Sequence, residues 1–275
     1  MWNDWLTIGP LTIHGYGVMT GIGIITAYLM IESRAKKEGL DYEKVLGLLI
    51  ACLVFGYSGS KLLYIITILP EVLADPASIL HHLSGGWVVI GGILGGILGG
   101  YLYCRWNKLP TWKFFDIALA AVAMAQGFGR IGCFFAGCCY GAVTDSWIGI
   151  TFSHSDFAPN GVKLIPTQLI SSALDFLLCA GLIWYHKNKR KNPGEVTALY
   201  LIFYSAGRFV LEFFRGDSAR GSVGVVSTSQ FIGLFTLLVG IIIFVMRRKA
   251  APEVLVASAE AATEEKATAE KQLSE

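Results

Sequence analysis

The stretch from Gly127 to Gly141 reads Gly-Phe-Gly-Arg-Ile-Gly-Cys-Phe-Phe-Ala-Gly-Cys-Cys-Tyr-Gly and closes a long apolar run. It places one arginine, Arg130, among closely spaced glycines. A charged side chain in hydrocarbon costs roughly 2.5–3.5 kcal/mol on insertion scales, so it indicates a functional site by default. Glycines beside it allow a ligand or another backbone to approach closely. This stretch therefore predicts a binding site built into an apolar helix.

The composition of the whole chain indicates a membrane protein. Of its 275 residues, 54% are hydrophobic and only 15% are charged, whereas soluble domains carry about 25% charged residues. Apolar runs of about 20 residues recur, and each is long enough to span a bilayer. Clustered basic and aromatic patches of the kind that bind nucleic acid are missing from the sequence, so we expect no nucleic-acid partner.

We expect an all-α polytopic membrane protein with seven transmembrane helices, the N-terminus outside and the C-terminus inside. Lysine and arginine collect after alternate apolar segments, beginning with the first, and such loops stay on the inner side. We expect residues 1–249 to form one membrane domain and residues 250–275, rich in Ala and Glu, to form a disordered or frayed cytoplasmic tail. The predicted spans are 11–31, 43–69, 84–104, 113–137, 165–186, 196–214 and 227–246.

Charged groups inside these segments converge on the outer half of the membrane. At 1.5 Å per residue, Arg130 lies roughly 25 Å from the inner end of its segment, within a core of about 30 Å. Lys61 reaches about the same height, and Arg208 lies just beyond the midplane by the same arithmetic. His14 and Tyr16 stand near the outer start of the first segment.

The sixth segment carries a second informative pattern. Tyr204, Arg208 and Glu212 are spaced four residues apart and therefore share one helix face. Arg208 and Glu212 could form a purely structural ion pair. Even so, Arg130 and Lys61 leave an excess of positive charge, which predicts an anionic ligand. A phospholipid phosphate suits it, because the planar fork of arginine binds phosphate with two parallel hydrogen bonds.

These motifs together resemble the prolipoprotein diacylglyceryl transferase family. The resemblance covers most of the chain outside the tail. It rests on Gly129-Arg130-Ile131-Gly132 closing at Gly141, Tyr204…Arg208…Glu212…Arg215 followed by Asp217, His14-Gly15-Tyr16-Gly17, Gly91-Gly92 and Pro166-Thr167-Gln168-Leu169.

The resemblance implies an enzyme of bacterial lipoprotein biosynthesis in the cell membrane, with its site facing the outer leaflet. It would transfer diacylglyceryl from phosphatidylglycerol to the lipobox cysteine thiol of a prolipoprotein, forming a thioether and releasing glycerol phosphate. Its partners would be that lipid and the prolipoprotein signal peptide, and no metal or organic cofactor is expected. By position, Arg130 and Arg208 match the family's essential arginines, and Tyr16 and Tyr204 match its site tyrosines. We also place Gly129, Gly132, Lys61 and Glu212 in the substrate-binding set.

The chain departs from the family pattern at several positions. Asparagines of the signature are replaced by Cys133 and Ala136, and a glutamate is replaced by Cys138. A histidine before Gly91-Gly92 is replaced by Ile90, and one before Pro166 by Ile165; the Tyr-Glu pair after Leu169 is Ile170-Ser171. The phosphate-binding half is thus kept and the acid–base half is altered. His14 and Tyr16 are our candidates for another general base, and a changed substrate is the alternative.

The clustered cysteines Cys133, Cys138 and Cys139 leave three roles open. They could be small apolar packing residues, a disulfide or redox centre on the oxidising outer face, or a metal site. The metal site is the least favoured, because no histidine lies nearby in the sequence. Two other functions remain: a membrane thiol oxidoreductase that uses these cysteines, and a non-catalytic protein that binds or moves anionic lipid.

Overall fold

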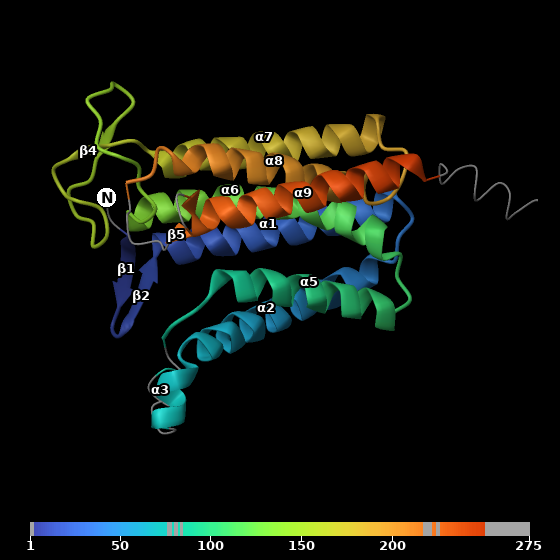
Figure 1. Cartoon of the computed structure of the whole chain (residues 1–275), viewed down its shortest axis with the longest axis horizontal. Coiled ribbons are helices and arrows are strands. Elements are labelled where there is room, and N and C mark those ends of the chain that lie inside the picture. Colours follow the sequence, from blue (N-terminus) through green and yellow to red (C-terminus); the bar gives the residue numbers. More distant parts are fainter. Residues whose placement is uncertain are drawn as a thin grey trace, which may run out of the picture. The chain divides into compact units, whose positions relative to one another are not determined.

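The computed structural model describes residues 3–75, 79, 82, 85–216, 222–223 and 226–250, and it is mostly helical (Figure 1). Within that part, seven helices have 18 residues or more, and each overlaps one predicted segment. They are α1 (Gly15–Lys37), α2 (Val45–Thr67), α5 (Val89–Trp106), α6 (Thr111–Ala136), α7 (Thr167–Asn188), α8 (Glu195–Glu212) and α9 (Thr228–Lys249). Two short helices, η1 (Tyr42–Lys44) and α3 (Leu69–Ala74), flank α2.

Five of the long helices are apolar and long enough to cross a membrane, namely α1, α2 with η1, α6, α7 and α9. The prediction of a helical membrane protein fits this structure. Helix α8 carries three charged residues, Glu195, Arg208 and Glu212, and α5 is short and rich in glycine. The count of seven spans and the orientation of the termini stay predictions. The predicted tail, apart from Ala250, lies outside the described residues.

Three short antiparallel hairpins supplement the helices. They pair β1 (Asp4–Ile8) with β2 (Leu11–His14), β3 (Ile150–Thr151) with β4 (Lys163–Leu164), and β5 (Ser222–Val223) with β6 (Val226–Ser227). The predicted start of the first span at residue 11 is therefore wrong. Leu11 to His14 alternates apolar and polar residues, as strands do, and Gly9 turns the chain with a φ of 58°. Helix α1 begins only at Gly15.

The chain divides into two compact units, and the division falls inside α1 and α6. One unit comprises Tyr28–Phe114, and the other comprises Met1–Ala27 with Phe115–Glu275. In the first, α2 and α5 pack against each other through glycines. A Cβ at Gly59 would collide with the carbonyl oxygen of Gly91, and one at Gly91 with that of Gly59. The glycines of α5 thus allow close helix packing, as small residues at this spacing do.

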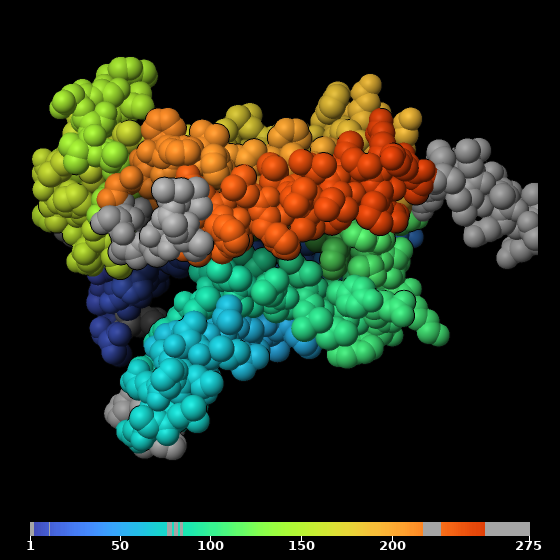
Figure 2. Space-filling view, in the orientation of Figure 1, coloured from blue at the N-terminus to red at the C-terminus, as the bar shows by residue number. Residues whose placement is uncertain are grey.

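The second unit holds α6, α7, α8, α9 and the first part of α1. Helices α8 and α9 pack along each other and lie side by side in both views (Figures 1 and 2). The buried Asp116 of α6 fixes the start of α8: its carboxylate accepts hydrogen bonds of 2.8 Å from the backbone N–H of Gly194 and of Thr197, and from the Thr197 hydroxyl. Asp116 thereby satisfies donors that the first turn of a helix leaves unpaired. Asp116 therefore has a structural role at this end of the unit.

Candidate functional site

The opening stretch of the sequence ends α6 and starts a tight turn. Gly137 follows the last helical residue with a φ of 73°, the left-handed conformation that ends many helices. Cys139 is also left-handed, with a φ of 61°. The backbone at Gly141 then passes close to two other segments. A Cβ there would lie 2.6 Å from the Ile165 carbonyl oxygen and 2.9 Å from that of Phe214. Glycine is required at this position by the close approach.

Two segments far along the chain hold this turn in place. After α8, the backbone N–H of Ala142 donates to the carbonyl of Phe214 at 2.9 Å, and that of Gly216 donates to Tyr140 at 3.2 Å. This pairing sets Arg215 opposite Gly141. Arg215 thereby comes beside the Cys139 thiol, with which it forms a hydrogen bond.

The start of α7 holds the turn from the other side. The Thr167 hydroxyl donates to the carbonyl of Cys139 at 2.9 Å, and the Gln168 amide donates to that of Cys138 at 2.8 Å. One turn further on, the Ser172 hydroxyl donates to the carbonyl of Gly127 in α6 at 2.9 Å. The Thr167-Gln168 part of the motif therefore fixes the backbone that follows Arg130.

A cavity of about 620 Å³ lies between α7 and α8, and Arg130 of α6 also lines it. Its charged and phenolic groups are Arg130, Asp175, Tyr185, Tyr204 and Arg208. The rest of the lining is mostly apolar, and Leu178, Leu182 and Phe203 are examples. The cavity thus brings together three of the predicted site residues, Arg130, Tyr204 and Arg208.

The two arginines of the cavity differ in their partners. Arg208 Nη2 lies 2.9 Å from Glu212 Oε2 and 3.4 Å from the Ser229 hydroxyl. Within the described part of the chain, the Arg130 guanidinium has neither a hydrogen bond nor an ion pair, and its electrostatic neighbours include Tyr204 and Asp175. Of the two cavity arginines, Arg130 is therefore the one without such a partner among the described residues.

Asp175 is the cavity residue that sequence reasoning did not select. It is buried, and its Oδ2 has no hydrogen-bond partner among the described residues. The signal was present, because Asp175 is the one acid of the apolar segment 165–186, and such acids tend to be functional. Its carboxylate gives the cavity a negative group between two arginines.

Tyr204 is positioned by aromatic stacking. Its ring lies parallel to that of Tyr200, with centroids 5.5 Å apart and an interplanar angle of 7°. The Tyr200 hydroxyl in turn donates to Gln126 Oε1 at 2.8 Å. The stack and this bond link α8 to α6 and fix the direction of the Tyr204 hydroxyl.

The remaining predicted residues of this unit are not part of the cavity lining. Tyr16 packs over Gly132, where a Cβ would come within 3.2 Å of the Tyr16 ring, and the side chain is 46% exposed. His14 ends β2, and its Nδ1 lies 2.6 Å from Asp4 Oδ1. A Cβ at Gly129 would meet no atom within 4 Å. Asp217 lies outside the described residues.

Lys61 belongs to the other unit, where it holds a loop. Its Nζ donates to the carbonyls of His82 and Gly85, both at 2.6 Å, and to that of Gly86 at 3.4 Å. It also lies 4.3 Å from the centre of the Trp87 ring, a favourable position for a cation. These contacts give Lys61 a structural role in its own unit.

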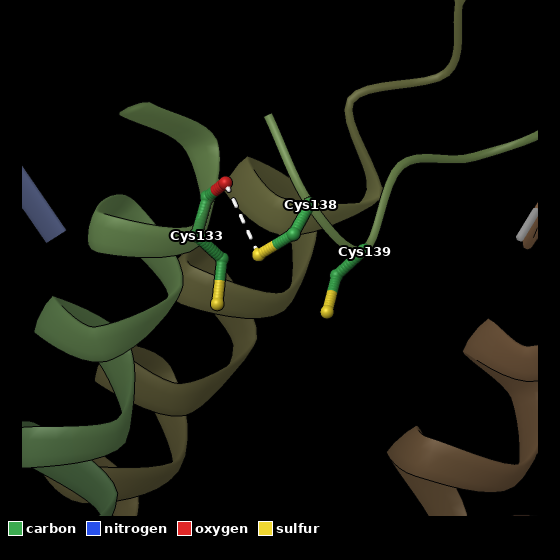
Figure 3. A group of neighbouring side chains, drawn as sticks. All are labelled: Cys133, Cys138 and Cys139. Atoms are coloured by element: carbon green, nitrogen blue, oxygen red, sulfur yellow. Dashed lines mark hydrogen bonds between the residues drawn. The ribbon is translucent and has the colours of Figure 1, made fainter. Parts of the chain in front are cut away.

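The turn after α6 gathers the three clustered cysteines (Figure 3). The sulfur atoms of Cys133, Cys138 and Cys139 all lie within 4.8 Å of one another, and each residue is half-buried. The Cys138 thiol lies 3.7 Å from the carbonyl oxygen of Cys133. Hydrogen bonds with Cys133 and Cys138, and then Arg215, lower the pKa of the Cys139 thiol. The same kind of bonds, to Cys133 and Cys139, raise the pKa of Cys138.

Comparison with known proteins agrees with this geometry. The family model described as prolipoprotein diacylglyceryl transferase matches residues 4–246. The chain belongs to this family. A phosphatidylglycerol–prolipoprotein diacylglyceryl transferase of Clostridium tetani is 45% identical over 85% of this chain and 93% of its own length.

Two further relatives carry the same description. The one from Clostridium perfringens, numbered 2 in its name, is 46% identical over 85% of this chain and 91% of its own length. The one from Finegoldia magna is 29% identical over 88% and 94%. The match to each runs almost from end to end, so the family resemblance is a property of the whole membrane domain.

Proposed function

We propose that this protein transfers the diacylglyceryl group of phosphatidylglycerol to the cysteine thiol of a prolipoprotein lipobox. The reaction forms a carbon–sulfur bond, breaks the bond between the glycerol carbon and the phosphate oxygen, and releases glycerol phosphate. The observation that carries this proposal is that Arg130, which lines a mostly apolar cavity, has no hydrogen bond or ion pair with any described residue. Relatives of this name match nearly the whole chain.

The cavity has the shape and polarity that a phospholipid needs. Its lining along α8 extends from Leu199 to Leu211, which is roughly 18 Å at 1.5 Å per residue. Along that length Leu199 and Phe203 come first, Tyr204 lies near the middle, and Arg208 lies toward the Leu211 end. An acyl chain fits the apolar part, because ligand pockets are mostly apolar with a few polar groups that fix orientation. The phosphate then lies at the arginines.

Arg130 is the proposed phosphate ligand. Its planar fork, which has no partner among the described residues, can bind phosphate oxygens bidentately. Arg208, held by Glu212, would stabilise the charge that grows on the departing phosphate monoester. Fixed cations placed where charge develops are usually the largest contribution to catalysis. Tyr204 would direct the lipid headgroup through its hydroxyl.

The substrate brings its own nucleophile, so the protein's task is to promote loss of the thiol proton. A free thiol has a pKa near 8.5, and nearby cations lower it. His14 and Tyr16 remain our candidates for the base. Gly129 leaves open space beside α6, and Gly132 allows Tyr16 to pack against that helix. These residues complete the proposed catalytic and binding set within this unit.

We further propose seven membrane spans, with the N-terminus outside, the C-terminus inside and the cavity open to the outer leaflet of the cell membrane. Three basic residues in the last turn of α1 and three in that of α9 support this orientation, because basic residues collect on the inner side. A site in the outer half would meet both the phospholipid and a prolipoprotein that emerges from the membrane.

The deciding experiment measures product from purified full-length protein in mixed micelles of detergent and phosphatidylglycerol, with a synthetic lipobox peptide. We expect release of glycerol phosphate and a peptide mass increased by one diacylglyceryl group. Arg130→Ala and Arg208→Ala should each lose at least 100-fold in rate. Arg105→Ala, at the far end of a helix in the other unit, is the matched control and should retain the rate. Lipid binding without product would contradict the proposal and favour the non-catalytic alternative.

A further inference from the structure

We propose that Cys133, Cys138 and Cys139 form a three-thiolate site for a soft divalent metal ion, with Zn²⁺ as the preferred one. The three sulfur atoms lie within 4.8 Å of one another and at one point of the fold, the turn that ends α6 (Figure 3). This inference does not rest on the proposed transferase activity.

The spacing of the sulfurs suits a shared ion. A zinc–sulfur bond of about 2.3 Å in tetrahedral geometry puts neighbouring sulfurs about 3.8 Å apart. The present separations reach that value if each thiol moves by about 1 Å or less, within the range of a side-chain rotation. A disulfide would need two sulfurs at about 2.05 Å and would leave the third out. The mutual proximity of all three favours an ion over a pairwise bond.

The backbone already holds the three ligands. Cys133 lies in the last turn of α6, and the left-handed residues Gly137 and Cys139 fold the next two thiols back toward it. The side chains of Thr167 and Gln168 secure the carbonyls of Cys139 and Cys138. Ligands held by such outer contacts lose little freedom when an ion binds, which favours affinity.

Charge also favours a divalent ion here. Three thiolates and one Zn²⁺ carry a net charge of −1, and the Arg215 guanidinium beside Cys139 compensates it. Arg130 is a second cation close to Cys133. Hard ions such as Mg²⁺ prefer oxygen ligands, so three sulfurs select against them.

Three protein ligands leave the fourth tetrahedral position of a zinc ion open. Structural zinc sites usually have four protein ligands, whereas sites with three bind water or an exogenous group in the fourth position. The inferred site is therefore of the open kind, able to accept water or a thiol from outside the chain.

The test is metal binding by the purified, reduced, full-length protein in detergent. Equilibrium dialysis should give one Zn²⁺ per chain, with no binding of Mg²⁺ under the same conditions. Co²⁺ should produce the near-ultraviolet charge-transfer absorption of a cobalt thiolate, and Zn²⁺ should remove it. Cys138→Ser should weaken Zn²⁺ binding by at least 100-fold. Cys52→Ser, which removes a half-buried thiol of the other unit, is the matched control and should bind normally.

A second measurement does not depend on any variant. X-ray absorption of the zinc adduct of the unaltered protein should show three sulfur atoms at about 2.3 Å. A shell of oxygen and nitrogen alone would overturn the site. So would a Cys133→Ser/Cys138→Ser/Cys139→Ser variant that binds Zn²⁺ as tightly as the parent. A disulfide between two of these cysteines in protein isolated without reductant, with no Zn²⁺ uptake after reduction, would overturn it as well.

Discussion

At the residue scale, the two cavity arginines have different surroundings, and this predicts different effects on stability. Arg208 is paired with Glu212, and their side chains are 16% and 9% exposed, so Arg208→Met leaves a largely buried carboxylate without its partner. Breaking a fully buried pair costs about 3–5 kcal/mol, and this partly exposed pair should cost less. Arg130 has no such partner among the described residues. Arg130→Met therefore removes a cation that has no hydrogen bond or ion pair among the described residues, and it should lower the free energy of unfolding less than Arg208→Met does.

Thermal or denaturant unfolding in detergent checks this contrast. The two variants make the same chemical change on neighbouring helices, so each is the control of the other. Equal destabilisation would show that Arg130 has a structural partner, and would weaken its assignment as a phosphate ligand. Both variants should be inactive, which separates their shared role in catalysis from their different roles in folding.

A second prediction at this scale concerns the geometry of phosphate recognition. Arg130→Lys keeps the positive charge but loses the planar fork that binds two phosphate oxygens. We expect a 10- to 100-fold lower rate, about 1.4 kcal/mol for each factor of ten, with normal unfolding behaviour. The product assay with phosphatidylglycerol and lipobox peptide measures it. A fully active Arg130→Lys enzyme would mean that Arg130 acts only as a point charge.

The sequence predicts the arrangement of some site residues but not of others. The spacing of Arg208 and Glu212 predicted their ion pair, because residues four apart on a helix are neighbours. The gathering of the three cysteines was not predictable in the same way. It depends on left-handed backbone at Gly137 and at Cys139, and a cysteine in that conformation gives no sequence signal.

At the element scale, the start of α7 fixes the turn that follows α6. Gln168 is buried, and its amide donates to the Cys138 carbonyl at 2.8 Å. Gln168→Ala leaves that carbonyl without its donor, and an unsatisfied buried polar group costs about 1–3 kcal/mol. We therefore expect a lower melting temperature and a weaker three-cysteine site, because two of its thiols lie on this turn.

The control for this variant lies in the same helix. Asn188→Ala also removes an amide that donates to a carbonyl, that of Trp184, but at an exposed position. Water replaces the lost partner there, so the melting temperature should barely change. If the two variants behave alike, the Gln168 bond contributes nothing specific to the turn.

The positions of the helices followed closely from apolar run length and from the breaks between runs. The first segment was the exception, since Leu11 to His14 belongs to a hairpin rather than to the membrane helix. A strand of four residues with two β-branched side chains is easily absorbed into an adjoining apolar run. Its pairing with Asp4–Ile8 in a hairpin decides the outcome, and the length of the apolar run carries no information about that pairing.

At the scale of the whole molecule, the distribution of basic residues predicts the orientation of the protein in the membrane. That orientation in turn decides which substrates can reach the cavity. Arg34, Lys36 and Lys37 end α1, and Arg247, Arg248 and Lys249 end α9. An odd number of spans places the two chain ends on opposite sides. The hairpin of β1 and β2 should then face the outside, and Ala250, after α9, should face the cytoplasm.

Single cysteines introduced at these two ends test the orientation. Thr7→Cys lies on the exposed hairpin, and Ala250→Cys lies just after the last helix. In intact cells a membrane-impermeant maleimide should modify Thr7→Cys, and it should reach Ala250→Cys only after permeabilisation. Mass spectrometry of the labelled peptides separates these sites from the six native cysteines. Labelling of Ala250→Cys in intact cells would show the opposite orientation. The arginines would then face the inner leaflet, away from an emerging prolipoprotein.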